Sequence, residues 1–168
     1  MSMLFSEETT SAILKALDKS LALIEFELDG TIVDANQNFL GAMGYSITEI
    51  RGSHHSLFVD PVYAASNDYR TFWDRLRQGE FFTDEFRRLG KGGREVWIQA
   101  SYHPILDEAG KPFKVVKYAT DITDQMKARI QAGDLSADTQ EKVQSVAGAT
   151  QEMQASIQEI SQNMNKSQ

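Results

Sequence analysis

The sequence predicts an α+β fold in which a five-stranded antiparallel sheet packs against inserted short helices, with a helix at either end. Three observations predict it. Two strand-like runs flank Asp29-Gly30, and three more follow between residues 81 and 123. Capped helical segments lie between these two groups of strands. From Asp124 onward the chain contains no Phe, Tyr or Trp, so the tail does not build a core of its own.

The first half of the chain predicts a helix, a hairpin and then short capped helices. Ser6 is the expected N-cap of the amphipathic stretch SEETTSAILKAL, of which it is the first residue. The Asp-Gly pair joins two apolar runs, which is the strongest short-range hairpin signal. Asn36 is the expected cap of a helix that ends at Gly44. The stretch Ser46-Ile47-Thr48-Glu49 is a capping box. The stretch RGSHHSLFVDPVY is rich in turn formers and predicts irregular backbone.

The second half predicts one longer helix followed by three strands. Ser66 caps a helix that ends at Gly79, and its apolar residues Tyr69, Phe72, Trp73 and Leu76 recur at helical spacing. The strands occupy residues 81–90, 94–106 and 112–123, and Lys91-Gly92-Gly93 joins the first two.

The strand at 94–106 has two distinct faces, because successive side chains point to opposite sides of a sheet. One face carries Ile98, Ala100 and Tyr102 and is expected to meet the inserted helices. The other carries Trp97, Gln99, Ser101 and His103. We expect the N-terminal helix to cover that second face, which would place His103 away from any interior pocket.

The tail predicts a coiled coil. Its apolar residues are spaced alternately by three and four positions, which is an a/d heptad pattern: Val143, Val146, Thr150, Met153, Ile157, Ile160 and Met164. Such a narrow apolar stripe buries too little surface in a lone helix, and we therefore expect the helix to pair in a dimer or a four-helix bundle. The alternative is a frayed helix. The helix is predicted to begin near Ser136 or Asp138, after a break at Gly133. The heptad pattern runs on to Gln168, which predicts that the chain continues in a longer protein.

Composition excludes several classes of function. The chain of 168 residues has a net charge of −7, which argues against binding to nucleic acid or to anionic lipid. It has no apolar run of the roughly 18 residues that a membrane span needs. It has no Cys, which fits a reducing, cytoplasmic compartment and excludes a flavin–cysteine adduct and thioether-attached haem. It also has no P-loop, G-x-S-x-G or H-E-x-x-H motif, so no enzymatic activity is predicted.

Residues 20–124 resemble a PAS domain. The resemblance rests on the Asp-Gly hairpin, ANQNFLGAMGYSITEIRG, YRTFWDRLRQGE, KGGREVW and the closing DIT at residues 121–123. Within that family, GSHHSLFVDP and FWDRLRQGEFF are similar to the PAS domains of soluble chemoreceptors of the aerotaxis-receptor type. The tail resembles the first adaptation helix of a methyl-accepting chemotaxis protein. The resemblance thus implies a PAS domain at 20–124 and a signalling helix at 125–168, and the helix expected from the residues themselves forms an N-terminal cap at 1–19.

The resemblance implies a cofactor between the sheet and the inserted helices. FAD is the first expectation, and haem b or no cofactor are the alternatives. The implied contact residues are Trp73, His55, Phe58, Phe82 and Tyr102. Trp73 is also explained by core packing, and a lone histidine such as His55 serves either as a haem ligand or, more commonly, as a structural residue. His54 and His55 are adjacent and point apart, so we do not expect them to share a metal.

The resemblance also implies how a signal leaves the domain. Asp121 and Thr123 form the junction between the last strand and the following helix, either as helix caps or as a bistable switch. In the stretch AGATQEMQAS, Glu152 is the expected methylation site and Gln151 its neutral neighbour, although the stretch is also consistent with plain helix surface. The implied partners are a second copy of the chain, a chemotaxis histidine kinase with its coupling adaptor, and the receptor methyltransferase and methylesterase. The competing hypothesis is a cofactor-free PAS module for dimerisation and relay.

Overall fold

The computed structural model describes the backbone of residues 5–166 and the side chains of residues 5–147. It consists of two compact units, Met1–Thr123 and Asp124–Gln168. Within the described range, no helix has both the length and the apolar character that crossing a membrane requires.

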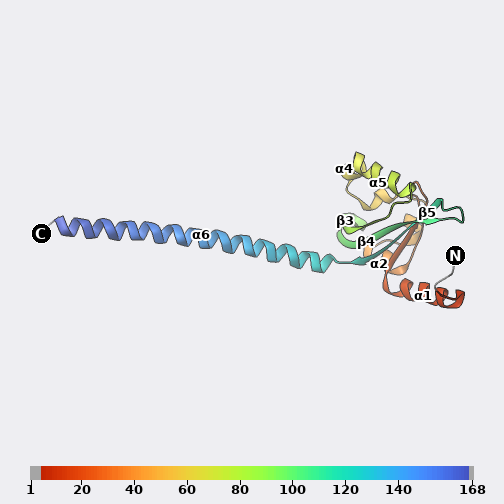
Figure 1. Cartoon of the computed structure of the whole chain (residues 1–168), viewed down its shortest axis with the longest axis horizontal. Coiled ribbons are helices and arrows are strands. Elements are labelled where there is room, and N and C mark those ends of the chain that lie inside the picture. The colour runs from red at the N-terminus through yellow and green to blue at the C-terminus, as the bar shows by residue number, and fades with distance from the viewer. Residues whose placement is uncertain (1–4, 167–168) are drawn as a thin grey trace. The chain divides into compact units, whose positions relative to one another are not determined.

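A five-stranded antiparallel sheet organises the first unit, as the sequence predicts (Figure 1). Its strands lie side by side in the order β2-β1-β5-β4-β3. The last strand in the sequence therefore lies in the middle of the sheet, between the first hairpin and the second. The strand bounds are β1 (Ala22–Phe26), β2 (Ile32–Ala35), β3 (Phe82–Leu89), β4 (Glu95–Leu106) and β5 (Pro112–Asp121).

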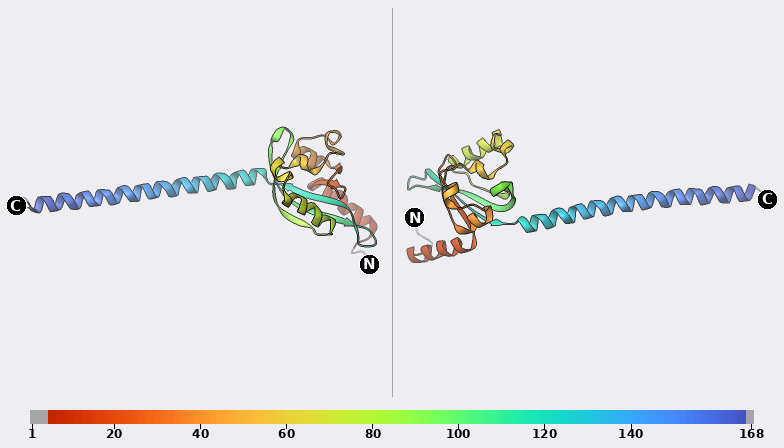
Figure 2. Two further views of the ribbon diagram at one scale, coloured as in Figure 1. Left: turned by 90° about the horizontal axis from the view of Figure 1, so that it is seen from above. Right: turned by 180° about the vertical axis from the view of Figure 1, so that it is seen from behind.

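Short helices between β2 and β3 cover one face of the curved sheet (Figure 2). They are α2 (Gln37–Met43), α3 (Ile47–Ile50), the 3-10 turn η1 (His55–Phe58), α4 (Pro61–Ala64) and α5 (Asn67–Arg77), and a short 3-10 turn η2 (Lys91–Gly93) joins β3 to β4. The predicted caps are confirmed. The Asn36 side chain accepts the Phe39 N–H at 3.0 Å, the Ser66 hydroxyl accepts the Tyr69 N–H at 3.1 Å, and Gly44 ends α2 with φ of 78°.

The inner face of the sheet and the helices enclose one core. Ile98, Ala100 and Tyr102 of β4 are all buried, which confirms the predicted inward face of that strand. The aromatic stripe of α5 is buried against them, with Trp73 only 3% exposed. Burial of these apolar side chains supplies the main stabilisation of the fold.

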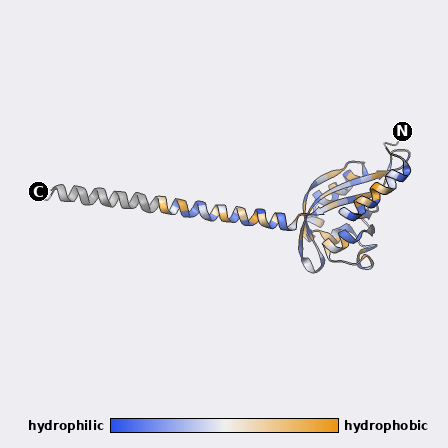
Figure 3. Ribbon diagram, turned by 90° about the horizontal axis from the view of Figure 1, so that it is seen from below, coloured by the Kyte–Doolittle hydropathy of each residue, from blue (hydrophilic) through white to orange (hydrophobic). Residues whose placement is uncertain are grey.

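The expectation that the N-terminal helix covers the outer face of the sheet is wrong for the single chain. Helix α1 (Glu7–Ser20) buries none of its residues, and the ribbon in Figure 3 shows hydrophobic segments of this helix in orange. The reason is local. The Asn36 and Asn38 amides donate to the backbone carbonyl oxygens of Asp18 and Leu21, at 2.8–3.1 Å, and so hold the end of α1 beside the start of α2.

The tail is a single helix, α6 (Thr123–Lys166), and the predicted break at Gly133 is wrong. A glycine inside a helix costs only about 1 kcal/mol relative to alanine, which the flanking turns offset. The heptad residues Val143 and Val146 are more than 60% exposed. The side chains of the later heptad positions, and of Gln151 and Glu152, lie outside the described residues.

Candidate functional site

The interior of the domain is organised around His55. The turn η1 places this imidazole at the centre of the core, fully buried. Six aromatic rings surround it, with centroids 5.4–6.3 Å from its own. They belong to Phe26, Phe58, Tyr69, Phe72, Trp73 and Tyr102.

Hydrogen bonds fix the orientation of His55. Its Nδ1 lies 2.8 Å from the Tyr69 hydroxyl and its Nε2 lies 3.0 Å from the Tyr102 hydroxyl. Arg88 Nη2 donates to the same Tyr102 oxygen at 3.2 Å. Because the Tyr102 oxygen accepts from Arg88 and can donate its own proton to Nε2, the arrangement favours the neutral His55 tautomer with its hydrogen on Nδ1.

The electrostatics agree with a neutral imidazole. Burial, and then the positive charges of Arg88 and Lys117, lower the pKa of His55 well below its usual value of 6.5. Burial also raises the pKa of Tyr69 to about 12. The Trp73 indole N–H opposes part of this rise in the pKa of Tyr69, although the Trp73 Nε1 atom has no hydrogen-bond partner among the described residues. The network is therefore uncharged except for the basic side chains at its border.

Lys117 is the most unusual residue of this interior. It lies on β5 between the buried residues Val115 and Ala119, and its side chain is fully buried. Among the described residues its Nζ has no hydrogen-bond partner, and it lies 5.1 Å from the centroid of the Phe39 ring and 5.2 Å from that of Tyr102. Burial, followed by the charge of Arg88, lowers the pKa of Lys117 well below 10.5.

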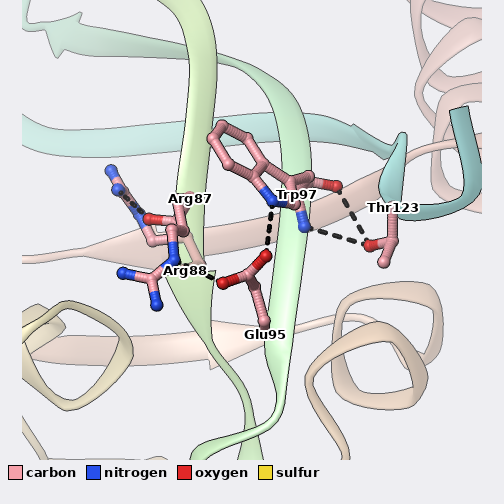
Figure 4. Close-up of polar contacts among 5 residues, drawn as sticks. All are labelled: Arg87, Arg88, Glu95, Trp97 and Thr123. Atoms are coloured by element: carbon pink, nitrogen blue, oxygen red, sulfur yellow. Dashed lines mark hydrogen bonds and ion pairs between the residues drawn. The ribbon is translucent and has the colours of Figure 1, made fainter. Parts of the chain in front are cut away.

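Arg88 is the second buried basic residue and is only 5% exposed. Besides the bond to Tyr102, its Nη1 donates to the Arg87 carbonyl oxygen at 2.9 Å, as Figure 4 shows, while its Nε is unpaired. The guanidinium lies over the Phe86 ring at 4.6 Å. Among the ion pairs described for residues 5–147, none involves Lys117 or Arg88.

The residues that the resemblance assigns to a cofactor lie together. Trp73, His55, Phe58 and Tyr102 are fully or almost fully buried in this core. Phe82 is partly exposed at its edge, where its ring lies 4.9 Å from that of Phe72. Their role in binding a ligand stays a prediction.

The other two histidines lie outside this core. His103 lies on the outer face, as predicted, where its Nε2 is 3.0 Å from the Tyr118 hydroxyl. The ring nitrogens of His54 are hydrogen-bonded, Nδ1 to the Ser56 hydroxyl and Nε2 to the Asp29 carbonyl oxygen. Across the described part of the chain, no group of His, Cys, Asp and Glu side chains is arranged to hold a metal ion.

The sequence reasoning missed Lys117 and Arg88. A signal for Lys117 was present, because the alternation of β5 places it on the same face as Val115 and Ala119. A lysine on an apolar strand face is a candidate buried charge. Arg88 was harder to find, since β3 is an edge strand on which most side chains are partly or fully exposed.

The packing of the core does not fit FAD or haem b as it stands. A flavin or porphyrin ring system would need the space that the His55 imidazole and its surrounding rings fill. Both His55 nitrogens are already hydrogen-bonded, so neither is free for iron. What the core offers a ligand is a set of aromatic faces and the unpaired N–H groups of Lys117 and Arg88.

A second polar cluster joins the sheet to the start of α6. The Asp121 carboxylate accepts the Thr123 N–H at 2.9 Å and the Thr123 hydroxyl at 2.6 Å. The Thr123 oxygen in turn accepts the Trp97 backbone N–H at 3.0 Å (Figure 4). Asp121 thus caps the first N–H of the helix, and Thr123 ties that cap to β4.

A sheet covered on one face, polar groups within the core and a helix continuing from the central strand are typical of a sensory module. A family profile described as PAS fold matches residues 18–127. The chain therefore belongs to the PAS family.

The chain is similar to several curated bacterial proteins. It is 44% identical over 121 residues to the biofilm dispersion protein BdlA of Pseudomonas aeruginosa, covering 72% of this chain and 29% of that protein. It is 25% identical over 114 residues to the aerotaxis receptor of Escherichia coli, and the match covers 68% of this chain and 22% of that protein. It is 27% identical over 135 residues to the oxygen sensor protein DosP of the same organism, and the match covers 78% of this chain and 16% of that protein. These likenesses support a role in signal transduction, although the chain spans less than a third of each relative.

Solved structures show the same fold. The PAS domain of a protein from Colwellia psychrerythraea matches with a TM-score of 0.59 and 26% identity, over 69% of this chain and 98% of that one. An RNA-binding light-oxygen-voltage receptor matches with a TM-score of 0.63 over 82% of this chain and 40% of its own. At 20% identity the second likeness concerns the fold alone.

Proposed function

We propose that this chain is the sensory part of a cytoplasmic chemoreceptor. A change in the interior around His55 is passed through Asp121 and Thr123 to α6. This helix controls a chemotaxis histidine kinase through its coupling adaptor. The observation that carries the proposal is the hydrogen-bonded cluster of Asp121, Thr123 and Trp97, which couples β4 and β5 to the first turn of the helix. The likeness to the aerotaxis receptor supports it. No catalytic activity is part of this function.

The stimulus is proposed to be a small ligand. FAD, the first expectation, has the aromatic contacts it would need, but the rings of the core must separate to admit it. The tight packing also favours a second candidate function, in which the domain binds nothing and serves as a dimerisation and relay module. The two functions differ in whether the core responds to a ligand.

Replacing Asp121 by alanine is expected to uncouple the sensor from the kinase. The change removes the acceptor for two donors of Thr123, and the loss of such a cap costs about 1 kcal/mol, which leaves the domain folded. The receptor that contains this chain should then show kinase activity that no longer responds to stimulus. The measurement is kinase activity in the assembled receptor, with and without stimulus.

Asp124→Ala is the matched control, because it removes the same charge from the first turn of the helix. It should leave the response intact. A normal response in Asp121→Ala would remove the junction from the proposal.

We also propose that α6 pairs with a second copy of the chain and carries the adaptation site. The heptad residues would form the seam, and Glu152 would be the acceptor for the receptor methyltransferase and methylesterase, with Gln151 beside it. Methylation removes a negative charge and so reduces repulsion along the bundle. Mass spectrometry after incubation with the methyltransferase should find one added methyl group at Glu152 and none in Glu152→Ala. An unmodified Glu152 would contradict the assignment.

A further inference from the structure

The interior of the domain contains two buried basic side chains that none of the described carboxylates neutralises. Lys117 is fully buried and Arg88 nearly so, yet neither contacts a carboxylate among the described ion pairs. Both contact the same side chain. Lys117 Nζ lies near the face of the Tyr102 ring, and Arg88 donates to the Tyr102 hydroxyl.

Such an arrangement is unfavourable unless something else pairs with it. Buried ionisable groups in proteins are usually paired or hydrogen-bonded, because desolvation of a charge is strongly unfavourable. The two aromatic faces beside Lys117 attract a cation but accept no conventional hydrogen bond. The N–H donors of the Lys117 side chain and the Nε–H of Arg88 therefore lack acceptors among the described residues.

We propose that Lys117 and Arg88 form the recognition site for a small organic anion, one that bears a carboxylate or phosphate group. This rests on the sensory role proposed above and names the chemical class of its ligand. The oxygens of such a group would accept the unpaired N–H donors of both residues. Arg88 offers an N–H adjacent to the one it directs at Tyr102, which is the geometry that planar carboxylates and phosphates prefer.

The ligand is small because the core is already filled. Six rings surround His55, so a molecule that enters must displace side chains, and each extra atom increases that displacement. The same displacement produces the signal. Lys117 lies on β5, the strand that ends at Asp121, so pairing of Lys117 with the anion acts on the strand that leads to the junction. The ligand shifts the population between the packed core and the opened one.

The test is thermal unfolding of the whole chain with a panel of probes at matched ionic strength. The probes are acetate, pyruvate and inorganic phosphate as sodium salts, with acetamide as the neutral counterpart. At least one anion should raise the Tm by about 5 to 10 °C at a hundred times its Kd, while acetamide should not. Lys117→Met and Arg88→Met should both lose this shift.

Matched controls are available on the same strands. Lys114→Met on β5 and Arg87→Met on β3 remove side chains that are partly exposed and paired with Glu25 and Glu95, respectively. Both control variants should keep the full shift. Lys117→Met is not expected to unfold the domain, so its loss of response is not a folding defect.

Three results would overturn the proposal. They are a shift no larger than that of acetamide for every anion, a shift that survives in Lys117→Met and Arg88→Met, and a flavin or Soret band in the visible spectrum of the purified chain. The third would leave the sensory role standing with a different ligand. Conversely, anion binding together with a normal kinase response in Asp121→Ala would keep this site and remove the proposed signalling junction.

Discussion

Replacing Lys117 by methionine should make the domain more stable at pH 7, by about 1 to 4 kcal/mol in the free energy of unfolding. Methionine has a similar length and an unbranched, apolar side chain that fits the space beside Phe39 and Tyr102. The substitution removes an amine that has no hydrogen-bond partner among the residues that the structure describes. A residue that lowers stability but persists in a core is typical of a functional site, where activity is retained at the expense of stability.

The gain in stability from Lys117→Met should become smaller as the pH rises. Burial lowers the pKa of Lys117 in the folded state well below 10.5, the value expected when the chain is unfolded. Between these two values the unfolded chain binds a proton that the folded chain does not, so the stability of the wild type rises with pH. The advantage of Lys117→Met is therefore largest below the folded pKa and narrows as the pH rises towards 10.5.

Denaturant unfolding followed by tryptophan fluorescence measures this effect, because Trp73 is buried in the same core. Lys114→Met is the control on the same strand. It breaks an ion pair with Glu25 at the surface and should change stability slightly, in the opposite direction. A Lys117→Met variant that is less stable than the wild type at pH 7 would show that the amine has a stabilising partner.

Replacing Tyr102 by phenylalanine should destabilise the domain by about 2 to 4 kcal/mol. The Tyr102 hydroxyl is hydrogen-bonded to both His55 Nε2 and Arg88 Nη2. Removing it leaves two polar groups without that partner in a core from which water is excluded. The loss of stability is larger than the contribution of one hydrogen bond, because each polar group left unpaired adds its own desolvation cost. Denaturant unfolding measures it directly.

Tyr118→Phe provides a closely matched control. The Tyr118 hydroxyl is also 3.0 Å from the Nε2 atom of a histidine, His103, but this pair lies on the exposed outer face. Water replaces the lost partner there, so the change should stay within about 0.5 kcal/mol. Equal effects of the two substitutions would mean that burial does not set the strength of the Tyr102 network.

Local signals in the sequence predicted the strands and most of the helices of this fold, but not η1, α4 or the uninterrupted start of α6. The Asp-Gly turn, the Asn36 and Ser66 caps and the stop at Gly44 all act within four residues, so their effect does not depend on the rest of the chain. The alternation of β4 likewise predicted that Tyr102 faces inward. The resemblance to the PAS family predicted that Trp73, His55 and Phe58 lie in the same interior. It did not reveal what fills that interior.

The strands, the helix caps, the inward faces and the family follow from the order of residues along the chain. Which side chains pair with one another follows from the way the strands assemble and pack. Lys117 and Arg88 lie on strands that are not adjacent in the sheet, and their contacts with Tyr102 depend on β4 lying between them. The position of α1 similarly depends on amide contacts between residues about 15 to 20 apart in sequence. Pairing across such separations follows from strand order and burial, and no local pattern of residues encodes it.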